Sequence, residues 1–185
     1  LVVTASLPAQ SAEFKVEKLN NGTALILVLG DIETGDEATF RRLSVEYPTA
    51  IVALDSNGGK LIPAIEIGKI VRLAGYATIV ADDFVCSSSC ALIWLAGSPR
   101  YLEPAGKVGF HASYRDNDGR FEETGVGNAI IGHYLSLLNL PQSAVIFATS
   151  ASPNDITWLD SSNTEQSGID YRSMDAGTRI NPSEG

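Results

Sequence analysis

Three strand-length apolar runs alternate with helical patterns in the first half of the sequence, and this alternation most limits the fold that the chain can adopt. The runs are residues 23–29, 49–54 and 76–81, and each is apolar almost throughout rather than at every second position. Continuous hydrophobicity is typical of strands buried on both faces, as in a parallel sheet covered by helices. Parallel neighbours also need a long crossover, which a helix supplies. The sequence therefore predicts an α/β fold with a parallel-rich sheet of repeated strand–helix units.

The segments around these runs carry matching signals. Thr34 and Glu37 have the spacing of a capping box at the start of a helical pattern that ends before Pro48. Residues 63–74 have a second helical pattern, and the alternation at residues 14–19 predicts a hairpin strand before the first apolar run.

The second half is less regular. We expect a helical stretch that ends at Leu95, a strand at residues 107–111 and a helix at residues 128–138. Residues 113–127 are polar and contain glycine, which predicts a loop. A loop of this length inside a compact domain is usually functional or mobile.

Composition excludes several functions. The 185-residue chain has 22 Asp plus Glu and 13 Lys plus Arg, so its formal net charge is −9. Such a surface repels phosphate backbones and anionic lipid headgroups, which argues against a nucleic-acid partner. No apolar run approaches the roughly 20 residues of a membrane-spanning helix, so we expect no membrane insertion.

The length predicts a single domain over residues 14–172, followed by a C-terminal tail at residues 173–185. Residues 1–13 are expected to be an N-terminal tail or a signal remnant, because residues 1–12 are uncharged and rich in small side chains. A signal remnant would indicate a periplasmic or secreted location, whereas a disordered tail would indicate none.

Three segments with chemically capable residues each follow a predicted strand: residues 55–59, 86–90 and 109–111. Open α/β sheets place their sites at this edge of the sheet. Each segment also has a structural explanation, since Gly58-Gly59 is a normal turn and a serine before a helix is a normal cap.

A serine mechanism would need a histidine near the serine cluster, because serine is a weak nucleophile until a base removes its proton. The sequence has only His111 and His133. His133 lies within an apolar helical pattern, where a helix-face or core role is expected. His111 ends a strand just before the polar loop, which is a better position for a general base.

Taken together, the three segments resemble a known family. Ser56-Asn57-Gly58-Gly59, the stretch from Cys86 to Gly97 and Val108-Gly109-Phe110-His111 are similar in content and order to the proteolytic subunit of Clp proteases and its periplasmic relatives, within the Clp/crotonase superfamily. The resemblance covers roughly residues 24–170. It implies that Ser88 is the nucleophile and His111 the general base. It also implies that the backbone amides of Gly59 and Ser89 form the oxyanion hole.

The third member of the catalytic set is less clearly marked. The segment around Asp155 resembles the terminal region of the family and places Asp155 nearest the expected aspartate, with Asp160 as the alternative. The sequence also departs from the family at Asn57, where the protease has proline, and at Cys86 and Cys90, where it has small residues.

Cys86 and Cys90 are the two cysteines of the chain. On a regular helix their Cβ atoms would be about 5–6 Å apart, against about 3.8 Å in a relaxed disulfide, so a bridge needs an irregular helix start. We expect a disulfide, which would suit an oxidising compartment. Two buried thiols or a metal pair are the alternatives, although a closed zinc site needs four ligands.

The resemblance implies a serine hydrolase, specifically a peptidase acting on a peptide or protein substrate, that requires no cofactor and no metal. Relatives form rings or trimer-based particles, so a homo-oligomer is open as well. One alternative is a non-catalytic Clp-like domain that binds extended peptides or partner proteins. Another is the acyl-thioester chemistry of crotonases, which a serine–histidine pair on an acidic chain fits less well.

Overall fold

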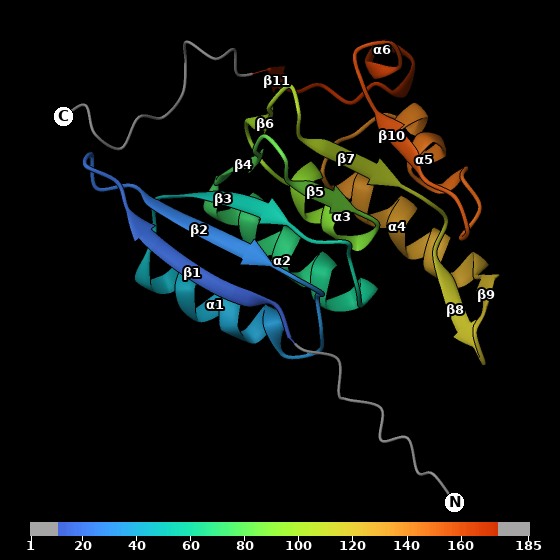
Figure 1. Ribbon diagram of the computed structural model, residues 1–185, viewed down its shortest axis with the longest axis horizontal. Helices are drawn as coiled ribbons and strands as arrows, with labels where there is room; N and C mark the ends of the chain where they lie inside the picture. The colour runs from blue at the N-terminus through green and yellow to red at the C-terminus, as the bar shows by residue number, and fades with distance from the viewer. Residues whose placement is uncertain (1–10, 174–185) are drawn as a thin grey trace, which may run out of the picture.

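A six-stranded sheet crosses the molecule (Figure 1). The structure is a computed structural model that describes residues 11–173, so most of the two predicted tails, residues 1–13 and 173–185, lies outside the described residues. The strand order is β1 (Glu13–Lys18), β2 (Ala24–Leu29), β3 (Ala50–Asp55), β4 (Ala77–Val80), β6 (Arg100–Leu102) and β11 (Arg172–Ser173). Every neighbouring pair is parallel except β1 with β2. The predicted α/β fold with a parallel-rich sheet is confirmed.

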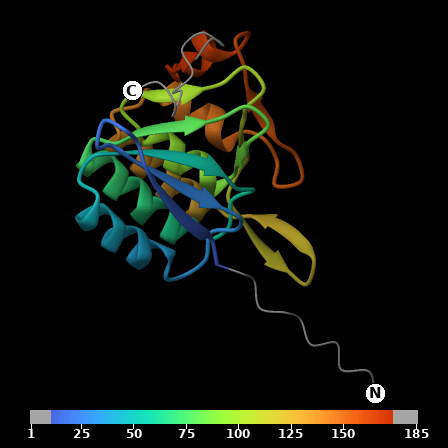
Figure 2. The same cartoon turned by 60° about the vertical axis from the view of Figure 1, so that its left-hand side comes forward.

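Helices α1 (Asp36–Glu46) and α2 (Leu61–Ala74) cover one face of this sheet, as Figure 2 shows. The core lies between them and the sheet, where Ile26 and Val28 of β2 and Phe40 of α1 are fully buried. Helix α3 (Ser89–Leu95) packs against α2 and is buried along its whole length. The apolar periodicity that predicted α1 and α2 therefore corresponds to their core-facing sides.

The start of α1 differs from the predicted capping box. Its N-cap is Gly35, and Thr34 does not cap the helix. The buried Asp36 carboxylate instead accepts hydrogen bonds from the Glu33 and Ala12 amides, at 2.7 and 3.1 Å. The predicted box is therefore wrong for the threonine, whereas the Glu37 carboxylate does accept a hydrogen bond from the amide of the N-cap Gly35, at 2.9 Å.

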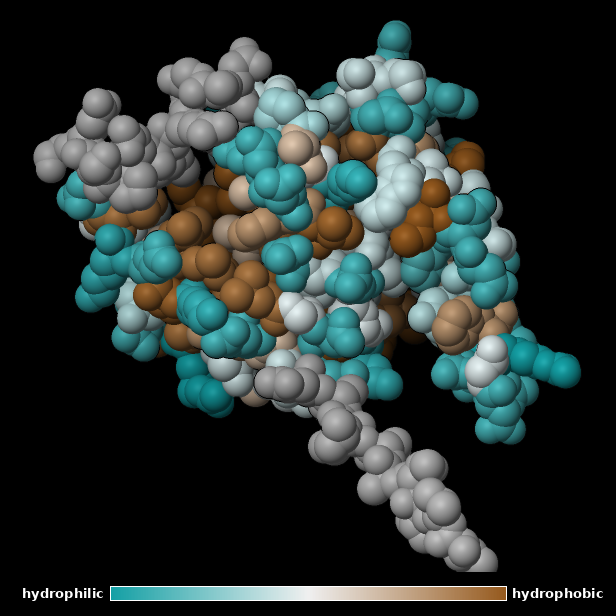
Figure 3. Space-filling view, in the orientation of Figure 1, coloured by the Kyte–Doolittle hydropathy of each residue, from teal (hydrophilic) through white to brown (hydrophobic). Residues whose placement is uncertain are grey.

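The opposite face of the sheet is apolar and partly open. Leu25, Leu27, Ile51 and Tyr101 are half-buried around Ala53 and Ile79 on this face, which Figure 3 shows as a brown area. Among the described residues no helix covers it, in contrast to the face that packs on α1 and α2.

A second, smaller sheet has the order β10 (Thr157–Leu159), β7 (Lys107–Phe110) and β5 (Val85–Ser87). The predicted strand at residues 107–111 corresponds to β7. Strand β5 runs parallel to β7 and joins the main sheet through a bridge between Cys86 and Ser56. The two sheets therefore meet where β3 ends.

The predicted loop at residues 113–127 is wrong in its central part, which is a hairpin of β8 (Tyr114–Asn117) and β9 (Arg120–Glu123). All eight strand residues are exposed, so the hairpin has no buried face that would give an apolar alternation.

The chain continues through α4 (Gly125–Leu137), α5 (Gln142–Thr149) and α6 (Thr164–Ser167). None of the helices in residues 11–173 has the length and hydropathy to cross a membrane.

Candidate active site

The glycine turn after β3 passes so close to Ile32 that it has no room for a side chain. The Ile32 amide donates to the Gly58 carbonyl and the Lys60 amide donates to the Ile32 carbonyl, both at 2.7 Å. A Cβ on Gly59 would lie 2.2 Å from the Ile32 carbonyl oxygen, and Gly59 has a φ of +137°. Because Gly58 and Lys60 make this bridge, the Gly59 amide points away from Ile32. No hydrogen bond in the described part of the chain uses that amide.

Ser88 forms the sharp turn between β5 and α3. It has φ 57° and ψ −128°, a conformation that costs a non-glycine residue roughly 1–3 kcal/mol. The turn is fixed from two sides, because the Ser88 amide donates to the Gly109 carbonyl at 2.9 Å and a Cβ on Gly58 would lie 2.7 Å from the Ser88 Cβ. A strained serine between a strand and a helix is typical of nucleophile turns, because it presents Oγ away from the backbone.

The start of α3 has no side-chain cap. The Ser88 hydroxyl accepts no capping hydrogen bond, and the first turn has no acidic residue. Within residues 11–173 the Ser89 amide donates no hydrogen bond, and the Ser89 hydroxyl is buried without a partner. Among the described residues, the turn therefore leaves the Ser88 hydroxyl, the Ser89 hydroxyl and the Ser89 amide without hydrogen-bond partners.

A disulfide joins Cys86 of β5 to Cys90 of α3, with the Cα atoms 5.2 Å apart. Both residues are fully buried. The bond links the residues two before and two after Ser88. Because Ser88 has a non-helical conformation, the helix start has the irregularity that such a bridge needs. The alternatives of two buried thiols or a metal pair do not apply to this structure, and its described residues contain no cluster of three or more His, Cys, Asp or Glu that would hold a metal.

His111 follows β7, directly beside β5. Since Ser87 pairs with Gly109 across these strands, His111 and Ser88 leave the small sheet next to each other. The Nδ1 atom of His111 lies 2.8 Å from the Ala112 carbonyl oxygen, so Nδ1 carries the proton and Nε2 is left as an acceptor. Among the described residues the two side chains share no hydrogen bond; such bonds often form only when substrate binds.

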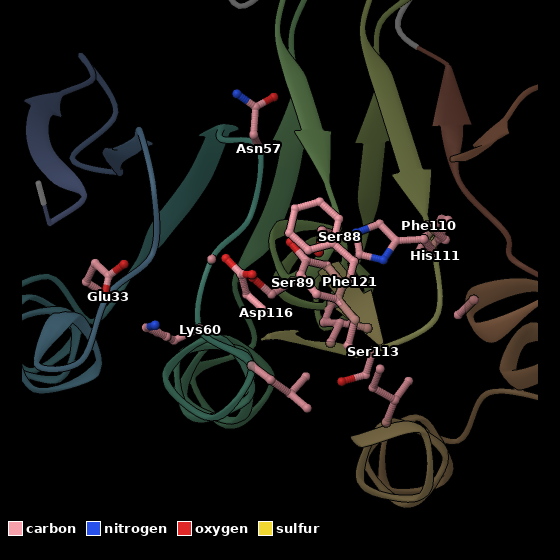
Figure 4. Close-up of a pocket in the computed structure, with 16 residues that line it drawn as sticks. Glu33, Asn57, Lys60, Ser88, Ser89, Phe110, His111, Ser113, Asp116 and Phe121 are labelled. Carbon is pink, nitrogen blue, oxygen red and sulfur yellow. The ribbon is translucent and has the colours of Figure 1, made fainter. Parts of the chain in front are cut away.

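A pocket of about 490 Å³ brings the predicted residues together. Ser88, Ser89, Gly59 and His111 all line it. In Figure 4 both serines and His111 gather with Phe121 on one side of this pocket, whereas Glu33 and Lys60 lie on the other. Its remaining apolar wall is formed by Leu61, Leu92, Phe110, Ile131 and Ala148. His133 is exposed on α4 and does not line the pocket.

Solved structures with a similar fold include two proteases. A serine-to-alanine mutant of 1510-N, a membrane-bound stomatin-specific protease, superposes with a TM-score of 0.59 at 15% identity, over 82% of this chain and 79% of that one. A lysine-to-alanine mutant of that protease in complex with a substrate peptide superposes with a TM-score of 0.59 at 15% identity, over 82% of this chain and 75% of that one. A mutant of ClpP1 from Listeria monocytogenes superposes with a TM-score of 0.54 at 13% identity, over 85% of this chain and 94% of that one. The chain has a Clp protease-like fold. No family model and no curated protein matches the sequence.

Neither predicted carboxylate reaches the pocket of this Clp-like fold. Asp155 is exposed, and its carboxylate accepts the hydrogen bond of the following Ile156 amide at 2.8 Å. Asp160 follows Leu159, which pairs with Val108, so it lies toward the end of β7 opposite His111. Its carboxylate accepts hydrogen bonds from the amide and hydroxyl of Ser162, which lower the pKa of Asp160. The orienting role that the sequence suggests for Asp155 therefore has no supporting contact among the described residues.

Sequence reasoning missed the aromatic wall that the hairpin adds to the pocket. The Tyr114 ring lies 5.5 Å from the His111 ring and 4.5 Å from the Phe121 ring, measured between centroids. Asp118-Gly119 was the signal for this hairpin, because both residues have positive φ and this dipeptide favours a two-residue hairpin turn.

The close approach of Gly58 to Ser88 gives a stability prediction. We expect Gly58→Ala to lower the free energy of unfolding by roughly 2–4 kcal/mol, because the new Cβ meets Ser88 and the φ of +110° disfavours a side chain. Gly125→Ala is the control, since a Cβ there has open space and φ is not positive. Urea unfolding of both variants tests this; equal midpoints would contradict the tight packing.

Proposed function

We propose that this chain is a serine peptidase with Ser88 as the nucleophile. The observation that carries the proposal is the shared pocket, where the free Ser88 hydroxyl, His111 and two unused amides converge. The Clp protease-like fold supports it. Metal and cofactor play no part in the proposed reaction.

In this mechanism His111 Nε2 takes the proton of Ser88 as Oγ bonds to the peptide carbonyl carbon. The imidazolium then gives that proton to the leaving amine as the carbon–nitrogen bond breaks. Water repeats the sequence on the acyl ester, releasing the carboxylic acid and restoring Ser88.

The Gly59 and Ser89 amides would bind the oxyanion of the tetrahedral intermediate. Both residues line the pocket, and neither amide donates within the described chain. A well-placed donor of this kind contributes roughly 3 kcal/mol to transition-state stabilisation. The Ile32 bridge supports this role, because it fixes the peptide groups on both sides of the Gly59 amide.

His111 would be oriented by the Ala112 carbonyl in place of a carboxylate. This acceptor lies 2.8 Å from Nδ1, whereas Asp155 and Asp160 lie outside the pocket lining. A backbone carbonyl selects the same tautomer as an aspartate but supplies no full negative charge to the imidazolium. The proposed site is therefore a serine–histidine dyad.

The substrate would be an extended peptide or protein segment, and the site of action an oxidising compartment such as the periplasm or the cell exterior. The buried disulfide supports that location, because disulfides persist in oxidising environments. A Clp-like domain that only binds peptides would have the same pocket, but it would gain nothing from a strained serine with a free hydroxyl.

A fluorophosphonate probe tests the nucleophile. We expect it to label Ser88, because an activated serine beside two free amides reacts with such electrophiles whatever its natural substrate. Labelling should disappear in Ser88→Ala and persist in Ser87→Ala, whose native hydroxyl donates to the Asn57 carbonyl. Intact mass and peptide mapping measure the adduct. Folded protein without an adduct between pH 6 and 9 would favour the binding module.

The orientation of His111 gives a second test. We expect His111→Ala to lower the labelling rate by about 10³-fold, because Ser88 then has no base to take its proton. Asp155→Asn and its control Asp160→Asn should keep the wild-type rate. A loss in Asp155→Asn on the scale of His111→Ala would show that Asp155 is the acid after all.

We further propose that the chain self-associates through α4 and α5. No Asp, Glu, Lys or Arg occurs from Gly125 to Asn154, although the chain carries a net charge of −9. Val126, Leu137 and Ile146 are 64%, 59% and 57% exposed there. Two equally acidic copies repel least where their surfaces have no charge, so a second copy fits this face best.

Leu137→Glu tests this assembly. We expect the variant to sediment as a monomer at concentrations where the wild type sediments as an oligomer, because it places like charges in the interface. Leu73→Glu is the control, since Leu73 on α2 is 88% exposed and lies outside the uncharged face. A monomeric wild type, or equal dissociation by both variants, would contradict the proposal.

A further inference from the structure

We propose that the Cys86–Cys90 disulfide is a positioning device that keeps the Ser88 hydroxyl available for attack. The inference rests on the proposed function, since it concerns the nucleophile of that site. The two cysteines do not line the pocket, so their effect would pass through the Ser88 turn.

Helix α3 begins without a side-chain cap. A serine before a helix usually accepts a hydrogen bond from an amide of the first turn, and this bond fixes the helix start. Helix α4 of the same chain is capped in this way, with Thr124 Oγ1 accepting from the Gly127 amide at 3.3 Å. Ser88 makes no such bond. A capping Ser88 would hold its hydroxyl against the helix, so a nucleophile at this position requires another way to fix the turn.

The conformation of Ser88 differs from that of a capping residue. A capping residue normally has extended dihedral angles, whereas Ser88 has φ 57° and ψ −128°. The local alternative is therefore relaxation of Ser88 to negative φ, with its hydroxyl turned onto the free amides of the first turn. The disulfide opposes this relaxation, because it ties the residue two before Ser88 to the residue two after it.

Cys86 lies where the two sheets meet. Cys86 pairs with Val108 of β7 on one side and bridges to Ser56 on the other. Strand β7 leads to His111, and Ser56 begins the turn that leads to Gly59. By bonding Cys90 to this residue, the disulfide fixes α3, and with it the Ser89 amide, relative to the other groups of the site.

Removal of the bond tests the proposal in two ways. The variant Cys86→Ala/Cys90→Ala removes both the bond and the sulfur atoms. Wild-type protein kept in excess dithiothreitol loses only the bond: two cysteine thiols form and the dithiol is oxidised to its own disulfide. Both samples should show at least a tenfold slower fluorophosphonate labelling of Ser88 than the oxidised wild type.

A structural reading comes from amide hydrogen exchange. The Ser88 amide donates to the Gly109 carbonyl, and this bond should open when the turn relaxes. We expect at least tenfold faster exchange at Ser88 in both samples, with unchanged exchange in β2 and β3. Ile93→Val is the control, because it reduces buried volume in the same helix without touching the disulfide, and it should alter neither reading.

The outcomes separate this inference from the proposed function. Wild-type labelling rates in the variant and in the reduced protein would overturn the positioning role, even if exchange were faster. If the oxidised wild type is not labelled at all, the peptidase proposal fails, and amide exchange alone then tests whether the disulfide fixes the Ser88 turn. Faster exchange at Ser88 in the variant and in the reduced protein would support that role of the disulfide, and unchanged exchange would overturn it.

Discussion

The contact on which the rest of the site depends is the passage of the Gly58–Gly59 backbone between Ile32 and Ser88. A side chain on Gly59 would collide with Ile32, and one on Gly58 would collide with Ser88. This contact joins three segments that are distant in sequence: the turn after β2, the turn after β3 and the turn before α3. The hydrogen bonds between Ile32 and the residues on both sides of Gly59 set the direction in which the Gly59 amide points. Two adjacent glycines are therefore a geometric requirement of the site, because each has a different neighbour.

The small sheet places Ser88 and His111 next to each other. Strands β5 and β10 have only three residues each, too few to be stable on their own. They are held because β5 bonds to Ser56 on one side and to β7 on the other, while β10 pairs with the far edge of β7. Ser88 and His111 leave this sheet at the same edge, so the distance between them depends on the register of β5 and β7.

The sequence predicts the parts whose burial leaves a pattern, and it misses those that depend on distant contacts. The core strands were predictable because burial on both faces makes them continuously apolar. The resemblance to the Clp protease family points to Ser88, His111, Gly59 and Ser89, and the structure gathers these residues in one pocket. Strand β5 is too short for a periodicity, and the β8–β9 hairpin has no buried face. At the start of α1 the N-cap is Gly35 in place of the expected Thr34, and the Asp36 carboxylate binds the Ala12 amide, a partner 24 residues away.

The acid was hard to assign for the same reason. An aspartate near the expected place in the sequence orients a histidine only if its strand brings the carboxylate to the ring, and the register of β10 on β7 decides this. That register pairs Thr157 with Phe110, and Asp155 lies beyond the paired strand, bonded to its own neighbour. The Ala112 carbonyl, adjacent in sequence to His111, needs no such register. In the proposed dyad this local acceptor orients the ring at the end of β7, while long-range contacts of the fold place Ser88 and Gly59 in the same pocket as His111.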